Sequence, residues 1–348
     1  MTTSGDKIEE ERDLKVLSKE AHKLTKLGRY KEAEEKYALV LKADSSNVYA
    51  LVGLGDLKRK KKEFQGAIDY YQRALDVEKD NKYALTGLGD AHRGLREVDK
   101  ALDLWLRYLS INPYDYKVMT RVADGFRRKG DYGQSKKYYF MAVREKPDDP
   151  FALMGLGDIF AREGNEGESL KYFERLIRIS DGKPDDSIMA LTSAANIYRK
   201  QGQYEKAMDC YERVLKINPQ NSYAWHGKAD CFRGLRDYPS AIKAWRMALE
   251  HGMDPKIAIT RIGNAYMSLK DLFQAEESYN KALSFGYDKY AYLGMTRIHD
   301  KRNEIDKALE IFSMLVEREP NDSRIISEFK SFLEKHPEVE ASAPALRR

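Results

Sequence analysis

The sequence predicts an all-α fold, an α-solenoid of about nine helix-turn-helix repeats followed by a C-terminal capping helix. Two observations predict it. A small residue followed four positions later by an aromatic residue recurs along the chain at nearly constant spacing, and an aliphatic residue comes four positions after each aromatic. Side chains at these offsets lie on one face of a helix, so each repeat contains an amphipathic helix with a buried stripe.

The small and aromatic residues form nine pairs, with successive spacings of 34, 34, 34, 34, 38, 34, 34 and 33 residues. The pairs are Ala33/Tyr37, Ala67/Tyr71, Ala101/Trp105, Ser135/Tyr139, Ser169/Phe173, Ala207/Tyr211, Ala241/Trp245, Ala275/Tyr279 and Ala308/Phe312. The aliphatic residues that follow are Leu41, Leu75, Leu109, Val143, Ile177, Leu215, Leu249, Leu283 and Val316. So many matches in register exclude chance.

A second small residue precedes most pairs by twelve positions, and it predicts the other helix of each repeat. These residues are Ala21, Gly55, Gly89, Ala123, Gly157, Ala195, Ala229 and Gly263. Two helices approach closely only where neither presents a bulky side chain, and the aromatic ring fills the volume beside that contact. Glycines mark the turn inside four repeats, and prolines stop the last helix of four. They are Gly28, Gly130, Gly164 and Gly202, and Pro113, Pro147, Pro219 and Pro320.

These residues resemble the tetratricopeptide repeat, a helix-turn-helix unit of 34 residues. The resemblance covers about residues 14–321. It implies a right-handed superhelix in which the first helix of each repeat lines a concave groove, and in which ligands contact repeated positions on those first helices. The shared residues are packing residues, so they indicate the fold rather than a particular partner.

The repeats set the expected organisation of the chain. We expect, in order, a mobile N-terminal extension (1–13), repeats one to five (14–183), part of a longer inter-repeat loop (184–187), repeats six to nine (188–322), a capping helix (323–336) and a mobile tail (337–348). The longer spacing falls on residues 181–186. It is either an ordinary longer loop, since surface loops tolerate extra residues cheaply, or a hinge between two halves of the solenoid.

A second repeating set remains once the packing residues are removed, and it is called the polar ladder below. Its core is an acid or amide directly after the small residue of the first helix, with a base three or four residues later. A large ring and a smaller side chain precede the acid at offsets that keep all four positions on one helix face. The polar ladder comprises Tyr49, Val52, Asp56, Arg59, Tyr83, Thr86, Asp90, Arg93, Thr120, Asp124, Arg127, Phe151, Asp158, Arg162, Thr192, Asn196, Arg199, Tyr223, His226, Asp230, Arg233, Thr260 and Asn264.

Two interpretations of the polar ladder stay open. By the resemblance, its acids and amides bind the backbone of an extended peptide, its arginines take acidic side chains or a terminal carboxylate, and its rings anchor the ligand. Alternatively, the acid and arginine form salt bridges within or between repeats that only stiffen the solenoid, at a few tenths of a kcal/mol each. Chaperone-binding members of the family need lysine at one of these positions. That position holds Val52, Thr86, Thr120, Met154, Thr192, His226 and Thr260, which disfavours that clamp.

Composition argues against most other classes of function. The 61 basic and 56 acidic residues are interspersed and give a net charge of +5, whereas nucleic-acid binding favours a basic stripe. Two cysteines, Cys210 and Cys231, are too few for a disulfide framework or thiolate zinc site, and the six histidines lack metal-ligand spacing. The Gly-Leu-Gly-Asp segments at 53–56, 87–90 and 155–158 fall on helix-packing positions, which explains them better than phosphate binding.

The sequence therefore predicts a non-enzymatic scaffold or adaptor that binds an extended peptide segment of a partner protein in the concave groove. We expect no catalytic residue, metal or cofactor, no nucleic-acid or membrane partner, and a monomer. With no apolar leader or membrane-spanning run in the sequence as given, we expect a cytoplasmic protein. Two alternatives remain: a regulatory receptor for a small signalling peptide, and a nucleic-acid-binding helical repeat protein.

Overall fold

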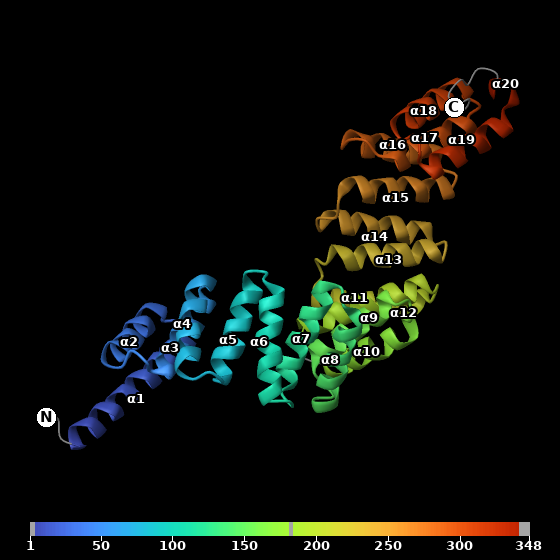
Figure 1. The fold of residues 1–348 in the computed structure, drawn as a ribbon. Coiled ribbons are helices and arrows are strands. Elements are labelled where there is room, and N and C mark those ends of the chain that lie inside the picture. Colours follow the sequence, from blue (N-terminus) through green and yellow to red (C-terminus); the bar gives the residue numbers. More distant parts are fainter. Residues whose placement is uncertain (1–3, 181–183, 341–348) are drawn as a thin grey trace. The chain divides into compact units, whose positions relative to one another are not determined.

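The structure, a computed structural model, describes residues 4–180 and 184–340, and these residues form helices α1 to α20 with no strand among them. The chain divides into two compact units, called here the N-terminal body (Met1–Ile179) and the C-terminal body (Ser180–Arg348). Within each body, consecutive helices lie side by side in chain order (Figure 1). The predicted fold class is confirmed.

The N-terminal body holds the first five helix pairs. Its helices are α1 (Ser4–Lys26), α2 (Tyr30–Ala43), α3 (Val48–Lys60), α4 (Phe64–Val77), α5 (Lys82–Gly94), α6 (Val98–Ile111), α7 (Tyr116–Lys129), α8 (Tyr132–Glu145), α9 (Pro150–Arg162) and α10 (Glu166–Ile179). Odd-numbered helices are the first helices of the repeats, and even-numbered helices are the second. Each predicted small and aromatic pair lies on a second helix.

The C-terminal body holds four further pairs and the chain's last helices. Its helices are α11 (Pro184–Lys200), α12 (Tyr204–Ile217), α13 (Ser222–Gly234), α14 (Tyr238–Glu250), α15 (Pro255–Ser268), α16 (Leu272–Ser284), α17 (Lys289–Lys301), α18 (Ile305–Arg318), α19 (Ser323–Lys335) and α20 (Pro337–Glu340). Among the described residues, every helix is too short or too polar to cross a membrane.

Asparagine and aspartate side chains start most of the first helices. Asn81 accepts hydrogen bonds from the backbone N–H groups of Tyr83 and Ala84, and Asp149 accepts one from Ala152. Such N-caps satisfy donors that have no partner inside the helix. The same role is taken by Asn47, Asp115, Asn221, Asp254, Asp288 and Asp322. The helices thus begin where a short polar side chain precedes the apolar stripe.

The turn inside each repeat requires left-handed backbone. The four predicted turn glycines all have positive φ, between 75° and 81°. Other repeats place a larger residue there, including Arg96 at φ 64° and Arg236 at φ 62°. Glycine adopts this conformation without strain, so the longer side chains stay there at some conformational cost.

The repeating packing residues form the core. The nine small residues of the pairs are fully buried, and the nine aromatic rings are at most 3% exposed. Where the small residue is serine, its hydroxyl donates to the first helix: Ser135 Oγ lies 2.7 Å from Ala123 O, and Ser169 Oγ lies 2.7 Å from Gly157 O. Burial of each large side chain contributes about 1.5–3 kcal/mol, so these rings dominate the stability of each repeat.

Helix α19 packs on α18 at the place where the sequence predicts a capping helix over 323–336. Its Ile325, Phe329 and Leu333 are buried, and the Phe329 ring stacks on Phe312 with centroids 5.0 Å apart. The apolar face of the last helix pair is thereby covered.

Three predicted boundaries differ from the structure. Helix α1 begins at Ser4, inside the predicted extension 1–13, because Lys7 to Arg12 are mostly strong helix formers. Residues 184–187 are the first turn of α11 rather than loop, since proline favours the first helical position. Pro337–Glu340 forms α20 at the start of the predicted tail 337–348. The remainder of that tail (341–348), residues 1–3, and the loop residues 181–183 with their possible hinge lie outside the described residues.

Candidate functional site

The polar ladder residues all lie on first helices. In the N-terminal body they lie on α3, α5, α7 and α9, and in the C-terminal body on α11, α13 and α15. Within each body, neighbouring ladder residues meet through two kinds of contact, which differ in the aromatic residue of the second helix.

The first kind is called here a tyrosine rung. The tyrosine hydroxyl donates a hydrogen bond to the acid or amide of its own repeat, and a glycine on the next first helix admits the ring. In the rung of Tyr71, the hydroxyl lies 2.7 Å from Asp56 Oδ1. A Cβ on Gly87 would lie 2.4 Å from Cζ of that ring, so only glycine fits. The other tyrosine rungs are Tyr211 with Asn196 and Gly227, and Tyr279 with Asn264 and Gly294.

The second kind is called here a tryptophan rung. Trp105 and Trp245 lack a hydroxyl, and their buried indole N–H groups have no hydrogen-bond partner among the described residues. On the next first helix, the glycine of a tyrosine rung is replaced by arginine. Arg121 Nε lies 3.2 Å from Asp90 Oδ1, and Arg261 Nη1 lies 2.9 Å from Asp230 Oδ1. The arginine supplies the contact to the acid that a tyrosine hydroxyl would otherwise make.

Each tryptophan-rung aspartate collects three arginines from three successive first helices. Asp90, which is 6% exposed, also meets Arg59 Nη1 at 3.3 Å and Arg93 Nη2 at 3.3 Å. The second cluster repeats this arrangement. Asp230, which is 4% exposed, meets Arg199 Nη1 at 3.3 Å and Arg233 Nε at 3.5 Å. One buried carboxylate therefore joins three repeats. Arg59 is also paired with Asp56 at 3.1 Å, so one guanidinium charge is uncompensated in the Asp90 cluster and two in the Asp230 cluster.

The next two ladder acids of the N-terminal body have opposite environments. Burial opposes ionisation of Asp124, but hydrogen bonds from Arg127 (2.6 Å) and Arg128 (2.8 Å) hold its pKa below the ordinary value. Burial raises the pKa of Asp158, against the weaker effect of the charges of Arg127 and Arg162. Asp158 makes no ion pair with a described residue, and Phe173 in its repeat has no hydroxyl to donate.

The smaller side chains of the ladder are occupied by internal contacts. Thr86 and Thr192 donate to carbonyls one turn back in their own helices. Thr120 and Thr260 reach the N-cap aspartates of the next repeat, with Thr260 Oγ1 2.7 Å from Asp288 Oδ2. Burial lowers the pKa of His226, which lies 3.7 Å from Asp230. These positions act in the solenoid itself.

The ladder rings are exposed where the first helices begin. Tyr49 is 49% exposed, Tyr83 62%, Phe151 70% and Tyr223 79%. Tyr49 and Tyr83, with Val52, Asp56 and other residues, line a hollow of about 510 Å³, called here the aromatic hollow. The structure thus brings four predicted residues to one concave site in the N-terminal body.

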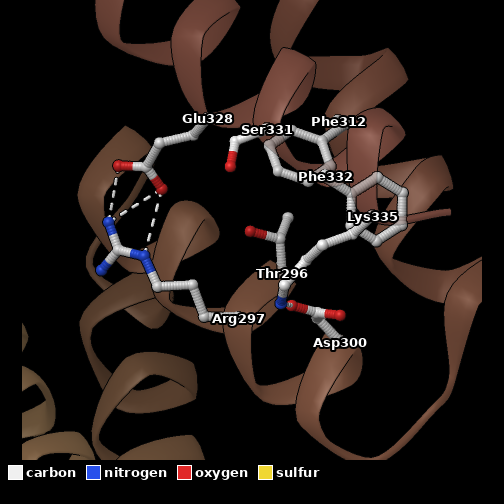
Figure 2. A pocket seen from close by; sticks show the side chains of 8 residues that line it. All are labelled: Thr296, Arg297, Asp300, Phe312, Glu328, Ser331, Phe332 and Lys335. Carbon is white, nitrogen blue, oxygen red and sulfur yellow. Dashed lines mark hydrogen bonds and ion pairs between the residues drawn. The ribbon is translucent and has the colours of Figure 1, made fainter.

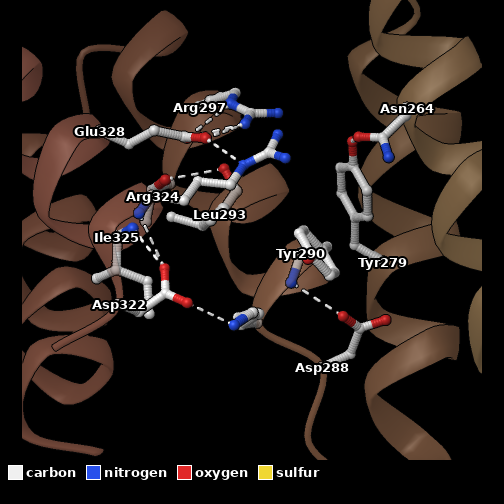
Figure 3. A network of polar contacts seen from close by, with 12 residues as sticks. Asn264, Tyr279, Asp288, Tyr290, Leu293, Arg297, Asp322, Arg324, Ile325 and Glu328 are labelled. Atoms are coloured by element: carbon white, nitrogen blue, oxygen red, sulfur yellow. Dashed lines mark hydrogen bonds and ion pairs between the residues drawn. The ribbon is translucent and has the colours of Figure 1, made fainter. Parts of the chain in front are cut away.

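A second hollow lies in the C-terminal body. It has a volume of about 500 Å³ and is lined by ladder residues Arg233 and Asn264 together with four arginines outside the predicted set. It is called here the arginine hollow, and those four residues are Arg236, Arg261, Arg297 and Arg324. Figure 3 shows Arg297 and Arg324 pointing toward Glu328, and Asn264 beside Tyr279 on the neighbouring helices.

A smaller hollow of about 240 Å³ lies between α17, α18 and α19 (Figure 2). Its charged residues are paired with one another: Arg297 Nη2 lies 2.6 Å from Glu328 Oε1, and Lys335 Nζ lies 2.7 Å from Asp300 Oδ2. Such pairing leaves little charge for a ligand. Within the described part of the chain, no group of three or more His, Cys, Asp or Glu side chains is arranged to hold a metal ion.

Family models identify the repeat. Models described as tetratricopeptide repeat match residues 19–78, 54–116, 122–184, 188–221 and 258–285. The chain is a tetratricopeptide repeat protein. The tyrosine and tryptophan rungs are therefore two ways in which one tetratricopeptide repeat packs against the next repeat of the same chain.

Known proteins resemble this tetratricopeptide repeat protein over segments. RNA polymerase II-associated protein 3 from Xenopus tropicalis is 32% identical over 112 residues, which are 32% of this chain and 17% of the relative. The general transcriptional corepressor trfA from Dictyostelium discoideum is 34% identical over 70 residues, 20% of this chain and 5% of the relative. The chain therefore spans less than a fifth of the length of these relatives. A solved structure, the C-terminal part of a TPR repeat-containing protein from Cytophaga hutchinsonii, has 18% identity and a TM-score of 0.60, and the match covers 70% of this chain and 98% of that chain. This likeness shows the fold.

Sequence reasoning missed Arg121 and the four arginines of the arginine hollow that lie outside the polar ladder. A signal for two of them was present: sixteen positions after Trp105 and Trp245 come Arg121 and Arg261, whereas the residue sixteen positions after Tyr37, Tyr71, Tyr139 or Tyr211 is glycine. Contacts between repeats, such as those from Arg59 to Asp90 and from Arg199 to Asp230, agree with the interpretation in which the salt bridges of the ladder stiffen the solenoid. Ligand contact by the ladder stays a prediction.

Cys210 and Cys231 are both buried, and neither forms a disulfide bond. Burial raises the pKa of the Cys231 thiol to about 11. A thiol in this state is a poor nucleophile at neutral pH, in keeping with a packing role.

Proposed function

We propose that this tetratricopeptide repeat protein is a non-enzymatic interaction scaffold, and that it binds an extended peptide segment of a partner protein on the face formed by its first helices. The aromatic hollow carries the proposal. It places two exposed tyrosine rings, Tyr49 and Tyr83, beside the carboxylate of Asp56 in a concavity of about 510 Å³.

The chemistry of the aromatic hollow suits a peptide. Exposed tyrosines supply large, rigid apolar area with a polar tip, and such residues dominate binding energy at protein interfaces. Micromolar affinity requires about 8 kcal/mol, which hydrogen bonds of about 1 kcal/mol each do not reach without an apolar anchor. The rings provide that anchor, and the acids and amides of the ladder orient the peptide backbone.

A selection from a random-sequence peptide library displayed on phage tests the proposal. We expect the wild-type chain to enrich a set of peptides, and the double variant Tyr49→Ala/Tyr83→Ala to lose part of that set. The matched control is Tyr114→Ala/Phe273→Ala. This variant also loses two large exposed rings, since Tyr114 is 74% and Phe273 71% exposed, but both residues lie outside the first helices.

Circular dichroism of all three proteins is the check that the variants keep the helical content of the wild-type chain. The proposal fails if the wild-type chain enriches no peptide, or if the ring variant on the first helices enriches the same peptides as the control.

A further inference from the structure

The arginine hollow has an unusual lining for a protein surface. Five of its residues are arginines, contributed by α13, the turn after it, α15, α17 and α19, and none of its lining residues is aspartate or glutamate. The remainder includes the amide of Asn264, the hydroxyl of Ser268 and an apolar part from Ala265 and Met267. The site therefore offers many donors and almost no charged acceptor.

The charges in contact with the hollow do not balance. Asp230 compensates Arg261 (2.9 Å) and lies near Arg233 (3.5 Å). Glu328 accepts from Arg297 at 2.6 Å and from Arg324 at 3.1 Å. Two carboxylates thus face five guanidinium groups, and three positive charges remain.

Arg236 is the group least engaged. Its side chain is exposed, and its guanidinium makes no hydrogen bond or ion pair with a described residue. It stands at the turn between α13 and α14 with φ 62°, a backbone conformation that a long side chain adopts at a cost. On the opposite helix, Asn264 Oδ1 already accepts from Tyr279, which leaves its Nδ2 group as a donor toward the hollow.

The N-terminal body carries nearly the same residues without this charge excess. Residues 81–96 and 221–236 share Asn, Tyr, Ala, Gly, Asp and the run Arg-Gly-Leu-Arg at equivalent positions. The next ladder position is Asp124 in the N-terminal body and Asn264 in the C-terminal body. The position after that, three residues beyond the glycine that admits the ring, is Asp158 in one and Arg297 in the other.

We propose that the arginine hollow binds a run of aspartate and glutamate side chains in an extended segment of a partner protein, an inference that rests on the proposed function and names the partner's chemistry. Guanidinium groups bind carboxylates through paired, charge-assisted hydrogen bonds. The arginines come from four helices and one turn, so the positive charge is spread out. A series of single negative charges along a peptide matches this distribution better than one concentrated dianion.

A polynucleotide fits the same charges less well. Nucleic-acid binding proteins neutralise a line of phosphates with a continuous basic stripe. Here the excess is confined to one hollow of about 500 Å³, and the ladder acid Asp230 contacts one of its arginines. The electrostatic match therefore favours an acidic peptide.

The test uses the full chain and the same displayed peptide library. The variant is Arg236→Asn/Arg324→Gln, in which asparagine tolerates the positive φ of position 236. The matched control is Arg96→Asn/Arg128→Gln in the N-terminal body. Arg96 has the equivalent turn position at φ 64°, and Arg128 pairs with Asp124 four residues before it, as Arg324 pairs with Glu328 four residues after it.

We expect aspartate and glutamate to be enriched about twofold over the input library in the pool selected by the wild-type chain and by the control. The enrichment disappears in the Arg236→Asn/Arg324→Gln pool, and the most enriched acidic peptide binds this variant about tenfold more weakly. Higher salt weakens binding to the wild-type chain.

The outcomes separate the two proposals. If the wild-type chain enriches no peptide, the proposed function itself fails. Enriched peptides without an excess of acidic residues, or an equal loss in the variant and its control, overturn the acidic-segment inference alone. Retention of a random single-stranded DNA pool at the same salt, lost in the Arg236→Asn/Arg324→Gln variant, also overturns it and makes the hollow a nucleic-acid site.

Discussion

Residues 81–124 of the N-terminal body and 221–264 of the C-terminal body build the same packing arrangement with different surfaces. Each has a tryptophan rung in which one buried aspartate meets three arginines. The two segments differ at the next ladder position, which is Asp124 in the N-terminal body and Asn264 in the C-terminal body. The comparison teaches that the residues between repeats are constrained by packing, whereas the residues facing outward from the first helices set the charge of each body.

A substitution at a tyrosine rung tests whether packing between repeats constrains these residues. Gly87→Ala places a Cβ 2.4 Å from the ring of Tyr71, so we expect the free energy of unfolding to fall by about 1–3 kcal/mol. Helix propensity alone predicts the opposite sign, because alanine is favoured over glycine inside a helix by about 1 kcal/mol. Chemical denaturation followed by circular dichroism measures the change.

Gly66→Ala is the control for this substitution. Gly66 also lies inside a helix, α4, but a Cβ there meets only Lys58 at 3.7 Å, an ordinary contact. We expect this variant to gain up to about 1 kcal/mol from helix propensity. Equal effects of the two substitutions would show that the glycine of the rung is not required by the ring.

Substitutions at Asp124 and Asp158 test how the charge environment of each ladder acid affects stability. The lowered pKa of Asp124 means that its ionised form stabilises the fold; this contribution is present above the unfolded-state pKa and is lost as pH falls through the folded-state pKa. We therefore expect Asp124→Asn to lose about 1 kcal/mol of unfolding free energy at neutral pH and progressively less in acid.

Asp158 should behave in the opposite way. Its pKa is raised, so its favourable contribution is present at low pH and is lost as pH rises through the folded-state pKa. Asp158→Asn is expected to keep or raise stability at neutral pH. Chemical denaturation of both variants at neutral and acid pH measures their free energies of unfolding. A loss of similar size at neutral pH for both variants would contradict the assigned environments.

Much of the fold follows from the sequence because its signals are local and repeated. The small residue, the aromatic ring and the aliphatic residue at intervals of four specify one helix face, and all nine pairs are found on second helices with their rings buried. The boundaries at 1–13 and 184–187 were wrong because helix-forming residues extend a helix beyond its packing stripe.

The candidate site was less predictable. The ladder acids and arginines were identified as one face, but some of their partners lie 31 residues away in adjacent repeats, as Arg59 does from Asp90. Contacts at that distance depend on how one repeat packs on the next. Arg236 and Arg324 lie off the repeating ladder positions altogether, and only the folded chain shows that they share a hollow with Arg261 and Arg297.

The central claim is that an amide in place of an acid helps to make one body selective for acidic segments. Asn264→Asp tests it directly, since an aspartate can accept from Tyr279 as Asp56 accepts from Tyr71, and the fold is thereby kept. The measurement is the affinity, by isothermal titration calorimetry, of the most enriched acidic peptide for this variant and for the wild-type chain. The account predicts binding about fourfold weaker, or about 0.8 kcal/mol, for the variant. Unchanged or tighter binding, with melting temperature unaltered, would contradict it.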